Sequence, residues 1–133
     1  MAKVTGLGWT TCSLDDSAGN PVAIVNDTTS VTFATPRGVQ DVTGADKSAY
    51  ERLLLLADFS CTLTGVFNTA VSHTALATIP STSAVRTLTL TTNGVTLPNE
   101  VLATDYALTR AASGELTWSV PCVLANGTAP TWA

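Results

Sequence analysis

The sequence predicts a mainly β protein, an antiparallel β-sandwich or partly open barrel with one flanking α-helix at about residues 46–57. Threonine occurs 24 times in 133 residues and mostly alternates with apolar residues. Such β-branched residues fit a pleated, half-buried surface. About eight short alternating segments, bounded by turn residues and joined without a linker, indicate a single sandwich.

Two strands are expected in the first half of the chain. Residues 31–35 alternate and stop at Pro36, and residues 39–42 resume the pattern. Residues 59–67 alternate more cleanly. Their shared apolar face consists of Phe59, Cys61, Leu63 and Phe67. Each of these strands therefore has one side to bury.

Two hairpins are expected in the second half. Asn93-Gly94 separates residues 85–92 from residues 95–97 and is the strongest two-residue hairpin signal. Residues 101–110 and 115–123 predict a second hairpin across the turn at 111–114. The sides expected to be buried are Leu102, Tyr106 and Leu108 in its first arm and Leu116, Trp118 and Val120 in its second.

One segment has helical spacing. Residues 43–46 offer a Thr or an Asp as the capping residue. Tyr50, Leu53, Leu54 and Ala57 then follow at positions i, i+3, i+4 and i+7. These features predict a helix of about three turns. A short helical turn is also expected within residues 72–79, before Pro80.

Composition restricts the function. Charged residues make up 12% of the chain, below the typical ~25%, and hydrophobic residues 45%, so disorder is excluded. Six Lys and Arg against ten Asp and Glu give a net charge of −4. This balance argues against a protein that grips nucleic acid or an anionic membrane. A weakly charged, threonine-rich exterior points to assembly.

No cofactor, metal or membrane span is expected. The cysteines Cys12, Cys61 and Cys122 are widely spaced without a C-x-x-C pair, and the sequence leaves open whether any two approach. Asp41 and Asp46 flank a glycine-containing loop that lacks the calcium-loop pattern. The longest apolar run is five residues, far short of the ~20 that a span requires.

Catalysis is not expected either. A hydrolytic triad needs a base, and His73 is the only histidine, with no Gly-x-Ser-x-Gly motif in the chain. Trp118 alternates with apolar residues and is predicted to lie in the core. Trp9 and Trp132 lie near the termini and are interpreted as packing anchors or interface plugs.

The order of elements resembles the major tail tube proteins of long-tailed phages. A strand ends in the long segment 36–46, the expected helix and the strand 58–68 follow at once, and the closing part runs from 114 to 132. The resemblance covers roughly residues 22–132. It implies that residues 21–133 form a single β-sandwich domain of tail-tube type. Residues 1–20 match nothing in the pattern and are expected to form an N-terminal arm or loop.

The resemblance implies a structural virion protein. Subunits of this family form six-fold rings whose sheets join edge to edge, and the rings stack into a tube through which DNA passes without specific binding. An acidic lumen would repel phosphate. The implied partners are further copies of the chain and other tail proteins such as the tape measure and terminator proteins. The implied location is the virion tail, after assembly in the host cytoplasm.

The resemblance also assigns a subunit-interface loop. Its residues are Pro36, Arg37, Gly38, Val39, Gln40, Asp41, Val42, Thr43, Gly44, Ala45 and Asp46. Arg37 is the residue expected to form a cross-subunit ion pair.

Three other functions remain open. Low charge and exposed sheet edges would equally suit another virion β-sandwich, such as a capsid decoration or head–tail completion protein. A carbohydrate-binding module on the same sandwich would need two or more coplanar exposed aromatic residues. An enzyme would depend on His73.

Overall fold

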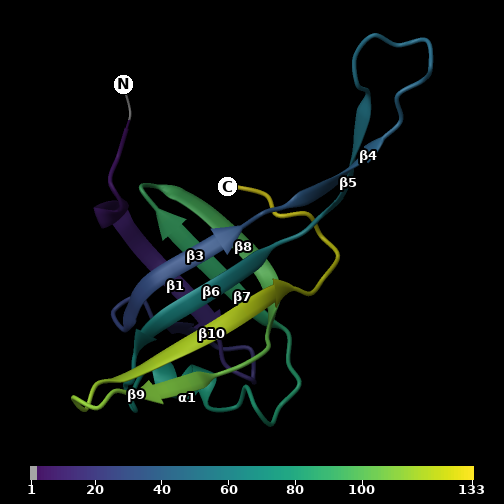
Figure 1. The fold of residues 1–133 in the computed structure, drawn as a ribbon. Helices are drawn as coiled ribbons and strands as arrows, with labels where there is room; N and C mark the ends of the chain where they lie inside the picture. The colour runs from purple at the N-terminus through teal and green to yellow at the C-terminus, as the bar shows by residue number, and fades with distance from the viewer. Residues whose placement is uncertain (1–2) are drawn as a thin grey trace.

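Strands form most of the molecule in the computed structural model, which describes residues 3–133. In chain order the elements are η1 (Gly6–Gly8), β1 (Trp9–Asp15), β2 (Pro21–Ala23), β3 (Thr28–Ala34), β4 (Arg37–Asp41), β5 (Arg52–Ala57), β6 (Ser60–Val66), α1 (Ser72–Leu76), β7 (Arg86–Thr92), β8 (Val95–Ala103), β9 (Ala107–Arg110) and β10 (Leu116–Leu124). The expectation of a mainly β, antiparallel protein is confirmed, and its one α-helix is short (Figure 1).

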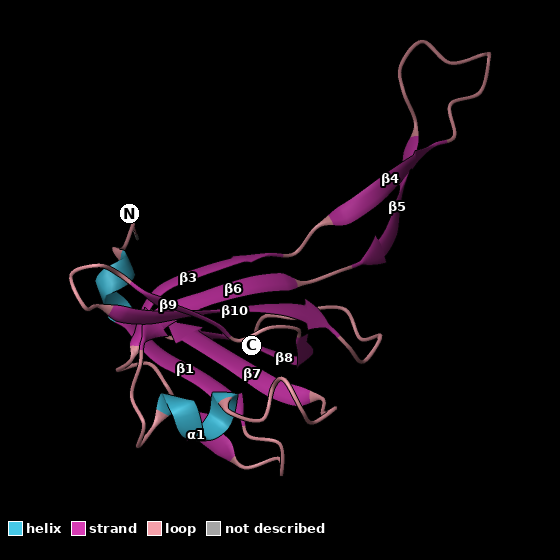
Figure 2. Cartoon of the chain, turned by 60° about the horizontal axis from the view of Figure 1, so that its bottom comes forward, coloured by secondary structure: helices cyan, strands magenta, loops and turns pink. Residues whose placement is uncertain are grey.

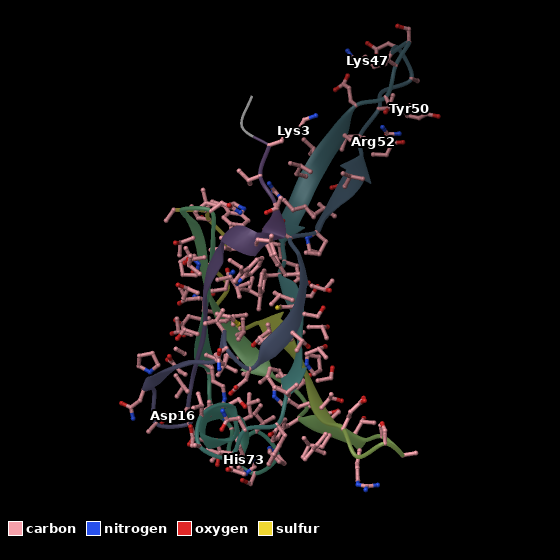
Figure 3. The ribbon with its side chains drawn as sticks, turned by 90° about the vertical axis from the view of Figure 1, so that its left-hand side faces the viewer. Lys3, Asp16, Lys47, Tyr50, Arg52 and His73 are labelled. Carbon is pink, nitrogen blue, oxygen red and sulfur yellow. The ribbon has the colours of Figure 1, made fainter. Side chains whose placement is uncertain are left out.

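The main sheet has the strand order β2-β1-β7-β8-β10-β6-β3, and β9 also pairs with β10. Every pairing is antiparallel. Only residues 101–103 of β8 pair with β10, at residues 122–124. Beyond this short junction the sheet folds over, so that β1, β7 and β8 face β3, β6 and β10 across a layer of side chains (Figure 3).

The core lies between these layers and follows from the strand alternation. The largest fully buried side chains include Trp118, Phe59, Leu14, Leu63, Leu88, Leu97 and Val120. Trp118 lies opposite Gly65 on β6 and donates a 2.8 Å hydrogen bond from Nε1 to the carbonyl oxygen of Val66. A Cβ on Gly65 would collide with the Trp118 ring and with the Asp27 carbonyl oxygen. Glycine therefore allows the tryptophan to pack, and the predicted core position of Trp118 is confirmed.

Both predicted hairpins are present. Asn93 and Gly94 have φ values of 50° and 83°, the left-handed conformations that a two-residue turn of this kind requires. β9 and β10 form the second hairpin. Its expected first arm, however, is divided, because the chain leaves β8 at Ala103 and turns before β9. Leu102 consequently points outward and is 41% exposed, and Leu108 and Leu116 are also exposed, so the prediction that these three leucines lie on buried faces is wrong. Tyr106 is half-buried, and Trp118 and Val120 are buried as predicted.

The helix predicted at about residues 46–57 is wrong. Residues 52–57 form strand β5, which pairs with β4, and residues 43–51 form the connection between them. The cause is that this segment projects away from the body, so neither a helical stripe nor a strand face is buried by its own chain (Figure 2). The leucine segment instead forms backbone hydrogen bonds with β4, and this strand pairing overrides the helix propensity of the leucines. The helical turn expected within 72–79 is confirmed as α1.

Residues 1–20 were expected to form an arm or loop, which is wrong for residues 9–15. These residues form β1, paired with β2 and β7, and they bury Cys12 and Leu14 in the core. The alternation of Cys12 and Leu14 with Thr11 and Ser13 is too short to stand out beside the two aspartates that follow. Residues 1 and 2 of the expected arm lie outside the described residues.

Candidate assembly surfaces

The most exposed apolar surface is a two-stranded arm formed by β4, β5 and the residues between them (residues 37–57, hereafter the arm). The arm continues the β3–β6 pair past Pro36, where the proline interrupts the ladder, and extends beyond the sandwich (Figures 1 and 2). Its exposed large apolar residues are Val39, Val42, Tyr50, Leu53, Leu54, Leu55 and Leu56. Leu56 is 92% exposed. Such a concentration of apolar surface marks an interaction site.

The tip of the arm is ordered by hydrogen bonds around Thr43. The Asp41 carboxylate accepts bonds from the Thr43 N–H at 3.0 Å and from its hydroxyl at 2.6 Å, and the Glu51 N–H donates to the Thr43 hydroxyl at 2.8 Å. Both hydrogen bonds lower the pKa of Asp41, and the bond from the Thr43 hydroxyl has the larger effect. The Lys47 ammonium lies 3.5 Å from the Glu51 carboxylate. This network gives the exposed tip a defined shape.

Two cations fix the arm at other points. Arg37 donates from Nε and Nη2 to the carbonyl oxygen of Leu55, at 3.1 and 2.9 Å, across the base of the arm. The Arg52 guanidinium lies over the Tyr50 ring, 4.6 Å from its centroid. Arg37 thus has a structural role within its own chain, and its cross-subunit ion pair stays a prediction.

The sequence-predicted interface residues all lie in or beside the arm, but not as one loop. Residues 37–41 form strand β4, residues 42–46 lie in its tip, and Pro36 precedes it. All are exposed except Thr43, which is half-buried. Sequence reasoning missed the second half of this surface, Tyr50 and residues 53–56. The available signal was a run of four leucines, which has no polar face in either a strand or a helix.

The main sheet also has unpaired edges. Among residues 3–133, β2, β3 and β9 each pair with a strand on one side only. Neither β3 nor β2 contains a lysine or another charged residue to block addition of a strand. A cleft of about 410 Å³ runs beside β3, lined by residues 28–31 and by Leu7 and Trp9 from the N-terminal segment.

The outer face of β3, β6 and β10 carries no charged side chain. Its outward residues in the two central strands are Ser60, Thr62, Thr64 and Val66 on β6 and Thr117, Ser119, Pro121 and Val123 on β10. The opposite layer presents Thr87, Thr89 and Thr91 on β7, and the charged side chains at its outward strand positions are the carboxylates of Asp15 on β1 and Glu100 on β8. The first face is therefore uncharged and the second is sparsely acidic, and the acidic lumen stays a prediction.

The terminal tryptophans pack around one phenylalanine of β3. The Phe33 ring lies 6.4 Å from the Trp9 ring and 6.0 Å from the Trp132 ring, measured between centroids. The chain end also pairs with β8, where Thr96 and Ala133 exchange backbone hydrogen bonds of 3.0 and 2.8 Å. The prediction that Trp9 and Trp132 anchor packing is confirmed by these contacts, although Trp132 remains 50% exposed.

His73 lies on α1, and its ring contacts aromatic neighbours. Its Nδ1 lies 3.1 Å from the Tyr106 hydroxyl, and its ring centroid lies 5.0 Å from that of Phe67. Within the described residues no serine or cysteine side chain bonds to this ring. The arrangement is a packed hydrogen-bonded pair, not a nucleophile with its base.

The three cysteines are free and buried. Cys61 and Cys122 are direct partners on β6 and β10, which answers the question of their proximity. Burial raises the pKa of Cys12 to about 11 and, together with the other thiols, the pKa values of Cys61 and Cys122 to about 12. The thiols are therefore protonated and unreactive while the protein is folded.

Over residues 3–133, no group of three or more His, Cys, Asp or Glu side chains is arranged to hold a metal ion. No helix in this part of the chain combines the length and apolar character needed to cross a membrane.

Comparison with known proteins identifies the fold. No family model matches the sequence, and no curated protein does. Among solved structures, the chain matches one from the tail of an empty gene transfer agent particle refined with C6 symmetry, with a TM-score of 0.79 and 17% identity. It also matches a chain from the virion of a native gene transfer agent particle, with a TM-score of 0.76 and 15% identity. Each match covers 98% of this chain and 99% of the other. The chain has the fold of these particle proteins over its full length.

Proposed function

We propose that this protein is the subunit of a phage-like tail tube. Copies assemble into six-subunit rings, the rings stack, and the resulting channel carries DNA without binding it specifically. The observation that carries this proposal is the apolar arm, which extends from the body and whose leucines at 53–56 remain 46–92% exposed in the described part of the chain. A monomer would expose this surface to water at a cost that a neighbouring copy removes.

The unpaired sheet edges support lateral assembly. An uncharged seven-residue edge strand such as β3 is a hazard in a monomer and a contact in a ring. The free edge of β9 lies at a different border of the same sheet and is the edge that we propose as the partner of β3. Joining such edges in sequence around an axis is a head-to-tail contact that closes into a ring when the rotation permits.

The full-length match to a chain in a C6-symmetric particle tail supports the choice of a tail over other virion locations. It also supports six as the ring order. Further proteins of a tail, such as a tape measure and a terminator, would then contact the inner surface and the end of the tube. The low positive charge of the chain agrees with a conduit that does not hold DNA.

Electron microscopy of the purified chain tests the proposal. We expect rings of six subunits and, at higher concentration, stacked tubes with a central channel. Labelling of the chain within its parent particle separates the tail tube from the capsid alternatives, since a decoration protein would be labelled on the head. A chain that stays monomeric at high concentration and is absent from the tail would refute the proposal.

A further inference from the structure

Arg86 on β7 is a buried cation whose hydrogen bonds all go to neutral groups. The residue is 1% exposed. Nη1 donates to the carbonyl oxygens of Asp15, at 2.9 Å, and Ala75, at 2.7 Å, and Nη2 donates to the hydroxyl of Thr78 at 2.9 Å. These bonds orient the guanidinium between β1 and the α1 region but provide no negative charge.

No carboxylate in the described residues pairs with Arg86. The two ion pairs in the described part of the chain are both made by Lys47, which lies in the arm. The carboxylates whose charge acts on Arg86 are those of Asp16 and Asp15, and the Asp16 carboxylate already accepts bonds of 2.9 and 3.0 Å from two N–H groups of its own loop. Burial lowers the pKa of Arg86, and Asp16 only partly opposes this effect. Buried charges in proteins are normally paired with an opposite charge. The guanidinium of Arg86 has neutral hydrogen-bond acceptors but no such anionic partner among the described residues.

A cleft of about 380 Å³ lies beside Arg86 and is rich in hydroxyl groups. Ser81, Thr82, Ser83 and Thr104 line it together with the arginine. Within the described residues, no hydrogen bond is made by the Nε of Arg86 or by the hydroxyls of Ser81, Thr82 and Ser83, and these three hydroxyl residues are exposed. The cleft therefore places Arg86 and several solvent-facing hydroxyl residues around one space that is open to solvent.

The geometry points to an oxyanion-binding site in this cleft, with Arg86 and the hydroxyls as its donors. The ligand class is a carboxylate or a phosphate group, because a guanidinium forms its strongest hydrogen bonds with these planar or tetrahedral oxyanions. Two sources carry this chemistry: a free inorganic anion, and the side chain of an Asp or Glu from a second copy. The site lies at the end of the molecule marked by Asp16 and His73 in Figure 3, away from the arm tip with Lys47 and Tyr50.

Thermal unfolding of the full chain in sodium phosphate tests the site, compared with sodium chloride of equal ionic strength. A ligand present at ten times its dissociation constant for the folded state raises the Tm of a domain of this size by about 4–7 °C. The informative variant is Ser83→Asp, which places a permanent carboxylate at the exposed rim of the cleft. We expect it to raise the Tm without phosphate and to abolish the saturable response to phosphate.

Two matched variants control this experiment. Ser83→Asn changes the shape of the side chain without the charge, and Ser113→Asp adds the same charge on the exposed turn between β9 and β10. Both should retain the phosphate response of the wild type. Phosphate also stabilises proteins by exclusion from their surface, but that effect is common to all variants and cancels in the comparison. Equal responses of Ser83→Asp and Ser83→Asn would overturn the assignment.

An assembly experiment in phosphate and in chloride distinguishes the two sources of the ligand. If a second copy supplies the carboxylate, phosphate should weaken assembly of the wild type relative to chloride, and Ser83→Asp should assemble poorly even without phosphate. If a free anion is the ligand, assembly should be equal in the two salts. The unfolding experiment requires no assembly, so its failure is distinct from failure of the tail-tube proposal.

Discussion

Leu56→Ser is the substitution that most directly tests the role of the arm. Leu56 is 92% exposed on β5, so its side chain contributes little to the folded monomer. Burial of a whole leucine side chain is worth about 1.5–3 kcal/mol. Loss of a contact that covers Leu56 therefore costs about 1.5–2.5 kcal/mol for each arm, which weakens that contact about 10- to 60-fold.

The assay is the protein concentration at which tubes first appear, measured by light scattering and checked by electron microscopy. We expect this concentration to rise about 10- to 60-fold for Leu56→Ser, since each added subunit brings one arm. Urea unfolding of the monomer should change by less than about 0.5 kcal/mol, as is usual for exposed positions. Leu56→Met is the matched control, because it keeps an apolar side chain of similar volume at the same place and should assemble like the wild type.

The two measurements together determine whether the reasoning holds. Tubes of Leu56→Ser at the wild-type concentration would show that the arm is not covered in the assembly. Loss of monomer stability equal to the loss of assembly would show instead that the leucine packs within its own chain.

Three further predictions concern the body and the arm tip. Gly65→Ala should destabilise the monomer by about 1–3 kcal/mol in urea unfolding, because its Cβ would collide with Trp118, and an unchanged midpoint would contradict that packing. Thr43→Val should raise the pKa of Asp41 toward its ordinary value in an NMR titration, because it removes the hydroxyl whose hydrogen bond is the main cause of the lowered pKa. The contribution of the thiols to the free energy of unfolding should be constant below about pH 9 and should fall as the pH rises toward 11–12, because the thiol pKa values are higher in the folded state than in the unfolded state. A variant with alanine at all three cysteines should lose this alkaline decline. These cysteines are Cys12, Cys61 and Cys122.

The parts of the fold that could be predicted from sequence are those where local chemistry and burial agree. Asn93-Gly94 specifies a turn with two positive φ angles, and threonines alternate with leucines in the strand before it. In β6, Cys61 and Leu63 alternate with threonines because one face is buried and the other is exposed. A period of two is legible only when the two faces of a strand have different surroundings.

Strand β1 shows a limit of prediction from local sequence patterns. Its two fully buried residues, Cys12 and Leu14, are separated by a serine and followed by Asp15 and Asp16, so the segment has the composition of a loop. It becomes a central strand only through its pairing with β7, more than 70 residues away along the chain. Long-range pairing of this kind leaves little trace in a window of a few residues.

The helix predicted for the arm segment was wrong for a reason that bears on function. The helical interpretation of Tyr50, Leu53, Leu54 and Ala57 assumed that an apolar stripe must pack against the core of its own chain. In the structure the leucines of β5 lie on both faces of a two-stranded ribbon, cross-strand from residues such as Val39, and stay exposed on both. An isolated two-stranded ribbon is marginal in water. The Thr43 hydrogen bonds at its tip and the Arg37 bonds at its base hold it in shape without covering it. Burial of these leucines by another copy, as the proposed assembly requires, would explain why they occupy positions that the monomer leaves exposed, and so the segment that packing within one chain does not explain is the part of the structure that best supports the proposal.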